Sequence, residues 1–517
     1  MRPLALILLC SLPALAQYDL IIRNARVVDG SGQAAFTADL AVKDGRIAAI
    51  GDLKGKTAER EIDAVGRVAA PGFIDVHTHI EGAVDKAPRA DNFLMDGVTT
   101  VVTGNCGGSA EALGEWYRKL EESGVGINIA SLVGHNTVRR QVMGTANRHA
   151  TPDELEQMKT LVAQAMEQGA VGFSTGLIYI PGTYSNTAEV VELARAAAAR
   201  GGVYASHMRD EGARILEAIR EAARVGQEAG MRVELSHFKI DTPRIWGFSA
   251  KSLALVEELR AKGLDIGVDQ YPYDHSSTGL GITLPSWALA DGPLKVRRRL
   301  KSPATRARIA AEMKGQLSNL GHKDYSYATV ASFEPNREYE GKTIPEVTRL
   351  KGWKPTLDNQ IRAIFDIQLA GGAQMVYHSM GEADVNRIMR YPHTAVASDG
   401  GVRVLGEGMP HPRSYGTNAR VLAEYVRMKQ VLTLEDAVRR MTSLPAGRFN
   451  LKDRGVLREG AAADIVVFDP ARVQDLSTYT EPHQYSMGFD FVFVNGVAAV
   501  DEGQPNEKRP GRILRRQ

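Results

Sequence analysis

Short apolar strands that end in polar residues alternate with helices rich in Ala, Leu and Glu through the middle of the chain. This alternation constrains the fold more than any other feature. Helices are expected over residues 152–168, 188–200 and 214–229. Eight such β/α units predict a parallel (β/α)8 TIM-like barrel of the α/β class. An open doubly wound sheet is the alternative, because strand count alone cannot close a barrel. The expected strands are residues 72–77, 99–105, 127–135, 170–176, 203–208, 233–238, 266–273 and 394–399.

Both ends of the chain have a different pattern, made of short β segments separated by Gly and Asp turns. Examples are residues 20–22 and 47–50 near the start, and residues 464–468 and 491–494 near the end. Two β-rich ends that flank a central region predict one small β-sandwich domain built from both. The chain has 517 residues, more than one compact core usually holds. We therefore expect a β domain from residues 17–70 and 445–517 and a barrel from residues 71–444.

The span 285–372 interrupts the strand–helix repeat. It is rich in charge, contains three consecutive arginines at 297–299 and includes an expected helix near residues 304–313. Loops on the mouth of a barrel commonly carry function, so we interpret the span as an insertion that acts as a lid over that mouth. A surface excursion without a role is the alternative.

The first residues resemble a secretory signal peptide. Arg2 precedes an apolar run at residues 4–12, and Ala14 and Ala16 form a small-x-small cleavage pattern before Gln17. The run is too short to span a bilayer, so we expect residues 1–16 to be removed and the protein to be exported, either periplasmic or secreted, with no membrane association afterwards. A chance apolar start on a cytosolic protein is the alternative.

Net charge gives little indication of a macromolecular partner. The formal value of +2 gives no reason to expect nucleic acid, and the one dense basic stretch, residues 508–515, is interpreted as a solvated tail. We expect a small-molecule substrate, and the sequence leaves the oligomeric state open.

Side chains of the kinds that bind metals lie at the ends of several expected strands. Barrel enzymes build their sites from the carboxyl ends of their strands, and histidine, thiolate and carboxylate suit zinc or a similar divalent ion. A single histidine at a strand end is more often structural, but several at corresponding positions predict a metal site. The predicted ligands are His77, His79, Cys106, His207, His237 and Asp399.

Other histidines do not follow this pattern. His135 ends the third strand and is a candidate for orienting a ligand from behind, and His411 is intermediate. The histidines at 149, 322, 378, 393 and 483 are interpreted as structural or solvated.

The ligand types indicate a hydrolytic reaction. A bound divalent ion polarises a carbonyl and lowers the pKa of bound water to about 7. Asp399 is the best candidate for the general base, because it can accept a proton from the attacking water and pass it to a leaving amine. The small neighbours Ser398 and Gly400 leave room for substrate.

Several segments resemble the amidohydrolase superfamily and, within it, the N-acyl-D-amino-acid deacylase (D-aminoacylase) family. Residues 71–75 (PGFID) and 77–79 (HTH) are similar to the superfamily's opening motif. The deacylase branch is indicated by residues 97–100 (GVTT), 103–107 (TGNCG), 172–177 (GFSTGL), 207–211 (HMRDE) and 398–400 (SDG).

This resemblance implies zinc-dependent hydrolysis of the amide bond of N-acyl-D-amino acids, and the preference for D rests on it alone. It implies a tight zinc site at Cys106, His207 and His237. A second, weaker position would lie at His77, His79 and Asp399, with Cys106 able to bridge. It also implies substrate contacts from Lys239, Arg413, Tyr179 and Tyr271.

Two other functions are considered. A cyclic-amide hydrolase of the dihydroorotase or hydantoinase type would carry a carboxylated lysine on the fourth strand, and residues 170–176 contain no lysine. A metal-binding or scaffold protein on an inactive barrel is the other. Ile80 ahead of Glu81, and Phe238 after His237, depart from the family pattern and leave substrate preference open.

Overall fold

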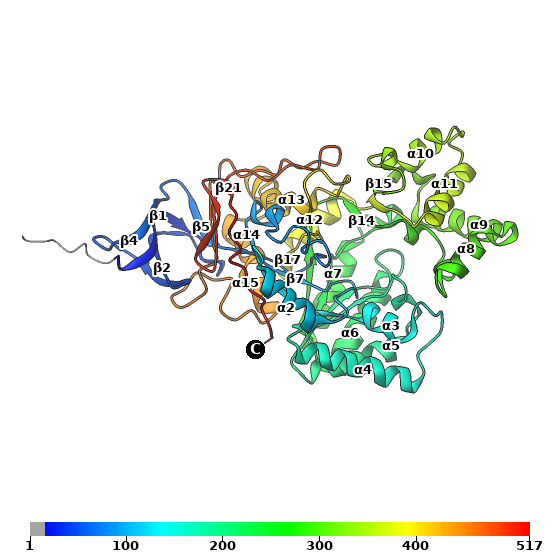
Figure 1. The fold of residues 1–517 in the computed structure, drawn as a ribbon, viewed down its shortest axis with the longest axis horizontal. Coiled ribbons are helices and arrows are strands. Elements are labelled where there is room, and N and C mark those ends of the chain that lie inside the picture. The colour runs from blue at the N-terminus through cyan, green and yellow to red at the C-terminus, as the bar shows by residue number, and fades with distance from the viewer. Residues whose placement is uncertain (1–15, 517) are drawn as a thin grey trace, which may run out of the picture.

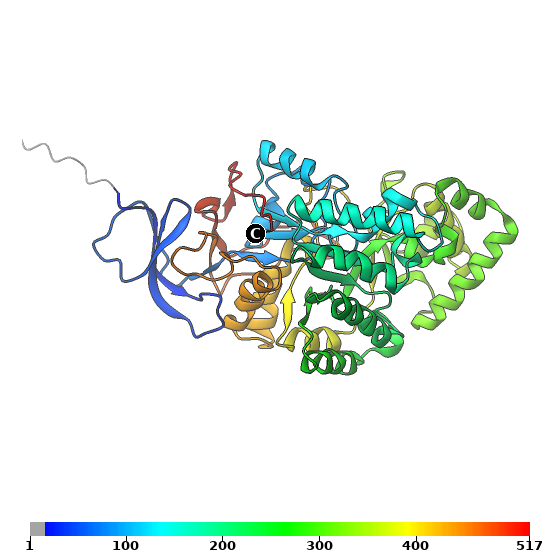
Figure 2. The same ribbon diagram turned by 90° about the horizontal axis from the view of Figure 1, so that it is seen from below.

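The computed structural model describes residues 16–516. The described chain is elongated, with a β domain at one end, a barrel in the middle and the insertion at the far end, as two perpendicular views show (Figures 1 and 2). Apart from Ala16, the expected signal peptide lies outside the described residues.

The expected strands of the repeat form a closed parallel barrel. One sheet has the order β17-β13-β12-β11-β10-β9 and a second has the order β6-β7-β8. Strands β8 and β9 follow one another along the chain, and a parallel bridge between Thr78 and Gly400 joins the other two edges. The barrel prediction is confirmed and the open sheet is excluded. The strands are β6 (Phe73–Asp75), β7 (Val98–Thr103), β8 (Asn128–Ser131), β9 (Val133–Gly134), β10 (Gly172–Gly176), β11 (Val203–His207), β12 (Val233–Leu235), β13 (Ile266–Gln270) and β17 (Thr394–Val396).

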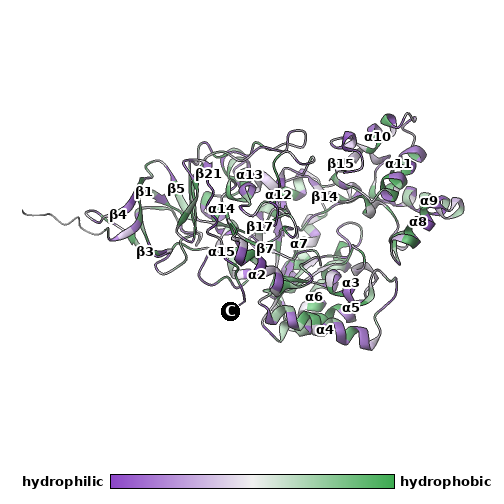
Figure 3. Ribbon diagram, in the orientation of Figure 1, coloured by the Kyte–Doolittle hydropathy of each residue, from purple (hydrophilic) through white to green (hydrophobic). Residues whose placement is uncertain are grey.

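Amphipathic helices surround the barrel. In α4, Met158, Val162 and Met166 recur at helical spacing and are buried, and Thr151 and Glu154 form a capping box at its start. Figure 3 shows hydrophilic and hydrophobic residues alternating along α4. The barrel helices are α1 (Asp91–Leu94), α2 (Leu113–Ser123), α3 (His135–Met143), α4 (Pro152–Glu167), α5 (Thr187–Ala198), α6 (Ile215–Ala229), α7 (Ser249–Ala261), α12 (Glu382–Arg390), α13 (Arg413–Arg420) with its π-helical continuation η7 (Val421–Met428), α14 (Leu434–Met441) and α15 (Ser443–Arg448).

Both chain ends contribute to one nine-stranded sheet, in the order β21-β20-β19-β18-β5-β1-β2-β3 with β4 beside β1. Leu20 and Leu40 from one half of this sheet share a buried core with Ile465, Val467 and Phe493 from the other half. The two halves therefore face each other across a common core, as in a sandwich. The strands are β1 (Tyr18–Val27), β2 (Phe36–Lys43), β3 (Arg46–Gly51), β4 (Ala58–Asp63), β5 (Val68–Pro71), β18 (Ile465–Phe468), β19 (Phe489–Val494), β20 (Val497–Asp501) and β21 (Gln504–Pro505).

The insertion is a compact unit with its own core, in which Ile309, Met313 and Phe365 are buried. It leaves and re-enters the barrel through two antiparallel strands, so it spans His275 to His378 rather than the expected 285–372. Its strands are β14 (His275–Gly279), β15 (Ala328–Ser332) and β16 (Gln374–His378), and its helices are α8 (Pro293–Lys301), α9 (Pro303–Leu320), α10 (Ile344–Leu350) and α11 (Leu357–Leu369).

The basic C-terminal stretch is not the solvated tail that the sequence suggested. Ile513 bridges to Ile129 of β8 in parallel, and Arg515 donates from Nη1 and Nη2 to the two carboxylate oxygens of Glu121 in α2. The end of the chain therefore packs against the barrel. Among residues 16–516, no helix is long and apolar enough to cross a membrane.

Candidate metal centre

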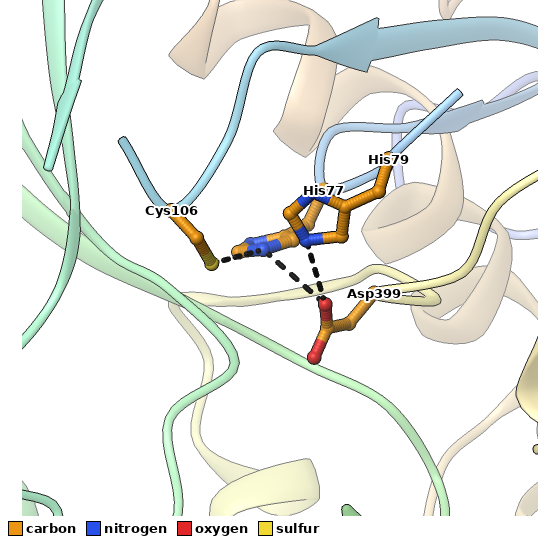
Figure 4. Close-up of side chains that lie close together, drawn as sticks. All are labelled: His77, His79, Cys106 and Asp399. Atoms are coloured by element: carbon orange, nitrogen blue, oxygen red, sulfur yellow. Dashed lines mark hydrogen bonds and ion pairs between the residues drawn. The ribbon is translucent and has the colours of Figure 1, made fainter. Parts of the chain in front are cut away.

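Four of the predicted ligands meet at the seam where the barrel closes (Figure 4). His77 and His79 follow β6, Cys106 follows β7 and Asp399 follows β17. The Nε2 atom of His77 lies 3.3 Å from Cys106 Sγ and 3.6 Å from Asp399 Oδ1, and His79 Nε2 lies 3.1 Å from the same carboxylate oxygen. Sulfur, nitrogen and oxygen atoms thus face a common point.

Cys106 also belongs to a second group. Its Sγ atom lies 3.5 Å from His207 Nδ1 and 3.4 Å from His237 Nε2, at the ends of β11 and β12. The ligand atoms of each group lie within 4.8 Å of one another. All six predicted ligands therefore converge, with the thiol shared between two groups. Their role as ligands stays a prediction.

The backbone at these positions is unusual. Cys106 (φ 51°), His237 (φ 36°) and Asp399 (φ 52°) occupy the left-handed region that residues other than glycine rarely adopt. The backbone N–H of His237 donates to Asp269 Oδ1 at 2.7 Å, and that of Asp399 donates to the His77 carbonyl at 2.9 Å. Strain of this kind gathers at functional sites, where the surrounding structure maintains it.

Charge in the site favours a thiolate. Burial raises the pKa of the Cys106 thiol, but the facing His77 and His237 outweigh burial and bring that pKa well below its usual value. Burial lowers the pKa of His79, yet the hydrogen bond to Asp399 and the charge of Cys106 raise it to about 9. The Cys106 thiol therefore loses its proton readily, and thiolate is the form that binds metal.

Two carboxylates that the sequence analysis did not identify lie behind the histidines. Glu211 Oε1 is 3.0 Å from His237 Nδ1, and its other oxygen is 3.8 Å from His207 Nε2. Asp269 Oδ1 is 3.4 Å from His77 Nδ1. A carboxylate behind a ligating histidine helps to orient its ring, and at His237 the Nζ atom of Lys239 also lies 2.7 Å from Nδ1. The sequence contains a signal for each of them. Glu211 ends the motif 207–211, and Asp269 is a charged residue inside an otherwise apolar strand.

The donor set fits a divalent ion such as zinc. Thiolate, imidazole nitrogen and carboxylate are zinc's usual ligands. His207 Nδ1 and His237 Nε2 face the thiolate, while the opposite ring nitrogens face Glu211, so each ring has one nitrogen directed toward the shared centre.

The predicted substrate residues have partners that the sequence did not indicate. Arg413 Nη1 is 2.9 Å from Asp399 Oδ2, and its guanidinium stacks on Tyr271 with 4.7 Å to the ring centroid. Lys239 is buried behind His237 and donates to both oxygens of Glu211 at 2.9 and 2.7 Å. The expected contact between Lys239 and a substrate carboxylate stays a prediction.

The remaining candidates divide between the pocket and the core. Tyr179 lines the pocket and its hydroxyl accepts a hydrogen bond from Thr278 at 3.1 Å. His411 accepts the backbone N–H of Arg413 at 3.0 Å and thereby helps to position that arginine. His135 is not behind a ligand, because its Nε2 pairs with Glu189 at 2.9 Å between α3 and α5.

A cavity of 600 Å³ opens directly onto the centre. Its walls come from the barrel and from the insertion together. Barrel residues at the wall include His79, Cys106, Asp399 and Arg413, and insertion residues include Ser277, Thr278, Ala331, Ser332, Glu334, Arg337, Glu340 and Gln374. The insertion therefore forms part of the cavity wall at the barrel mouth. That it acts as a lid stays a prediction.

Known proteins resemble this chain over nearly its whole length. N-acyl-D-glutamate deacylase and D-aminoacylase, both from Alcaligenes xylosoxydans xylosoxydans, are 37% and 34% identical to it, over 96% of this chain and 96% and 98% of their own lengths. The crystal structure of N-acyl-D-glutamate deacylase from Bordetella bronchiseptica, complexed with zinc and a phosphonate inhibitor, has a TM-score of 0.83 and 34% identity, covering 96% of this chain and all of that one.

Solved hydantoinases are more distant, at 17% identity and a TM-score of 0.57 for one D-hydantoinase, and show the fold alone. Residues 60–500 match the Amidohydrolase family. The chain, with its ligand-bearing strand ends on a closed barrel, is therefore a member of the amidohydrolase family.

Proposed function

We propose that this protein hydrolyses the amide bond of N-acyl-D-amino acids and releases a carboxylate and a D-amino acid. The observation that carries the proposal is that the Asp399 carboxylate belongs to the ligand cluster and also pairs with Arg413, at the wall of a cavity large enough for a small substrate. The relatives named above, a glutamate deacylase and a D-aminoacylase, act on substrates of this class.

The proposed cofactor is zinc, with a tight site at Cys106, His207 and His237 and a weaker position at His77, His79 and Asp399. Zinc, when bound there, supplies an electrophile for the scissile carbonyl and lowers the pKa of water. The assignment of the tight site is supported by Cys106, because its thiolate belongs to both groups of ligands and is the softest donor among them.

Asp399 is the proposed general base. Its carboxylate accepts the proton of the attacking water and then donates it to the leaving amine. Burial raises the pKa of Asp399, but Arg413 and His237 outweigh burial and keep that pKa well below its usual value. The base is therefore ionised throughout the neutral range.

Arg413 is the proposed anchor for the substrate's α-carboxylate, with Tyr179 beside the entry. A guanidinium can hold a carboxylate bidentately, and Arg413 already holds one, that of Asp399. If the α-carboxylate is held at Arg413 and the acyl group at the ligand cluster, exchanging enantiomers swaps the side chain with hydrogen, so the two enantiomers place the side chain in different surroundings.

The test is kcat/KM of the zinc-loaded full chain on matched N-acetyl-D- and N-acetyl-L-amino acids, with a hydantoin as a third substrate. Losing one charge-assisted anchor costs on the order of 1.5–3 kcal/mol, so the D form should be favoured by roughly 10- to 150-fold. Equal rates for the enantiomers contradict the proposal, and faster hydrolysis of the hydantoin favours the cyclic-amide alternative.

A further inference from the structure

A third group of metal-binding side chains lies at the neck of the insertion and shares no residue with the two groups around Cys106. Asp274, His275 and His378 offer three ligand atoms within 4.8 Å of one another. His275 Nδ1 lies 2.7 Å from Asp274 Oδ1, and His378 Nε2 lies 3.7 Å from Asp274 Oδ2. The rings of the two histidines are 4.7 Å apart between centroids.

The fold brings these residues together from two distant parts of the sequence. His275 begins β14 and His378 ends β16, and the two residues are register partners in the antiparallel pair. Asp274 precedes β14, and its carbonyl accepts the backbone N–H groups of Ser379 and Met380 at 3.2 and 3.0 Å. The group therefore lies where both strands of the insertion join the barrel.

The surroundings leave room for a ligand. A cavity of 420 Å³ is lined by His275 and His378, and by His322 from the insertion. His378 has 48% of its side chain exposed and Asp274 has 45%, so an ion can reach both from solvent. Tyr479 donates a hydrogen bond to Asp274 Oδ1 at 3.0 Å and steadies the carboxylate.

We propose that Asp274, His275 and His378 form a further divalent-metal site, separate from the Cys106 centre, that ties the two neck strands of the insertion together. Two imidazoles and one carboxylate suit zinc and similar first-row ions, and three protein ligands leave a position for solvent in the cavity. The site contains no thiolate, which distinguishes it chemically from the Cys106 centre.

The neck site is coupled to the catalytic pocket through β14. Two and three residues beyond His275, the carbonyl of Ser277 accepts a hydrogen bond from Arg413 at 3.2 Å, and Thr278 donates to Tyr179 at 3.1 Å. The His275 carbonyl itself accepts from His411 Nε2 at 2.9 Å. An ion that holds β14 against β16 therefore also holds the strand that contacts Arg413.

The experiment is a titration of the chelator-stripped full chain with Co²⁺, read by equilibrium dialysis at micromolar free metal and by absorbance. His378→Gln and Asp274→Asn each remove one ligand at a partly exposed position. His393→Gln is the matched control, since His393 is partly buried and belongs to none of the three ligand groups. Circular dichroism verifies that every variant is folded.

Wild type and His393→Gln should bind one equivalent more than either neck variant, and that increment should add no thiolate-to-cobalt charge-transfer band. Equal binding by wild type and both neck variants overturns the proposal. So does an increment that carries the thiolate band, because the extra metal is then at Cys106. A loss of the increment in His393→Gln as well assigns it to nonspecific binding.

Discussion

Asp399 combines three interactions that determine its chemistry. Its carboxylate contacts His79 at 3.1 Å and Arg413 at 2.9 Å, and its backbone N–H closes the barrel seam on His77. The left-handed backbone at Asp399 directs the side chain away from the strand and toward the cavity. A base bound to a guanidinium is fully ionised and well oriented, but weaker than a free carboxylate.

Replacing Asp399 by Asn tests its role as base. The amide keeps the size of the side chain, and the tight zinc site retains Cys106, His207 and His237. We expect kcat to fall by a factor of about 10² to 10⁴, the usual contribution of a general base, with the tight zinc retained. Steady-state kinetics and elemental analysis measure both. A change confined to KM would show that Asp399 binds substrate only.

The ion pair with Arg413 predicts a pH effect. Asp399 works as the carboxylate, so activity is lost below its pKa, and Arg413 lowers that pKa. In Arg413→Ala the pKa rises and the acidic limb of the kcat/KM profile should move to higher pH. Arg413→Lys keeps the charge and should leave the limb close to that of wild type. An acidic limb at the same pH in Arg413→Ala would show that the arginine does not influence the base.

The six candidate ligands could be predicted because they all obey one rule, that barrel sites form at strand ends. The partners of the candidate substrate residues could not. Lys239 and Arg413 bind carboxylates of Glu211 and Asp399, and these contacts depend on which way side chains turn beyond the strand. His275 and His378 meet only because β14 and β16 pair across the whole insertion, which no local pattern indicates.

At the scale of elements, the closing seam of the barrel depends on one buried carboxylate. Asp75, at the end of β6, accepts the backbone N–H of Ser398 at 3.0 Å and that of His77 at 3.1 Å. These bonds join the end of β6, which precedes His77 and His79, to the segment after β17, which carries Asp399. Burial raises the pKa of Asp75 to about 6 despite these bonds.

Asp75→Ala should destabilise the barrel. It leaves two buried N–H groups without an acceptor, at a cost of about 1–3 kcal/mol each. The midpoint of thermal unfolding should fall clearly below that of wild type. Asp75→Asn retains a carbonyl acceptor and should lose less. A variant Asp75→Ala as stable as wild type would mean that water replaces the carboxylate in the seam.

Element boundaries were harder to predict than element types. All eight expected strands are present, but most end earlier than expected. Residues 233–238 contain only β12, Val233–Leu235, because His237 turns out of the strand with positive φ. The insertion begins at β14, whose sequence HSSTG is polar and short and so resembles a loop. It forms a strand because β16 supplies its hydrogen-bond partners.

At the scale of the whole molecule, the β domain and the insertion lie at different positions relative to the metal centre. The β domain packs at one end, away from the cavity, while the insertion supplies part of the cavity wall (Figure 1). Because the insertion supplies part of the cavity wall, we expect the acyl and side-chain preferences to depend on it.

Export is a proposal at the same scale, based on Arg2, the apolar run that follows it and the Ala14–Ala16 cleavage pattern. Protein isolated from its native host outside the cytoplasm should begin at Gln17, as determined by N-terminal sequencing. Recovery with residues 1–16 still attached would contradict cleavage at this position.

The most direct test of the metal-dependent mechanism follows amine release from an N-acetyl-D-amino acid as zinc is returned to chelator-stripped protein. Wild type should be inactive when stripped and regain activity in step with bound zinc. Cys106→Ala should lose zinc and activity together, because the thiolate is shared by both ligand groups. Full activity in stripped wild type, or full zinc content in Cys106→Ala, would contradict the account.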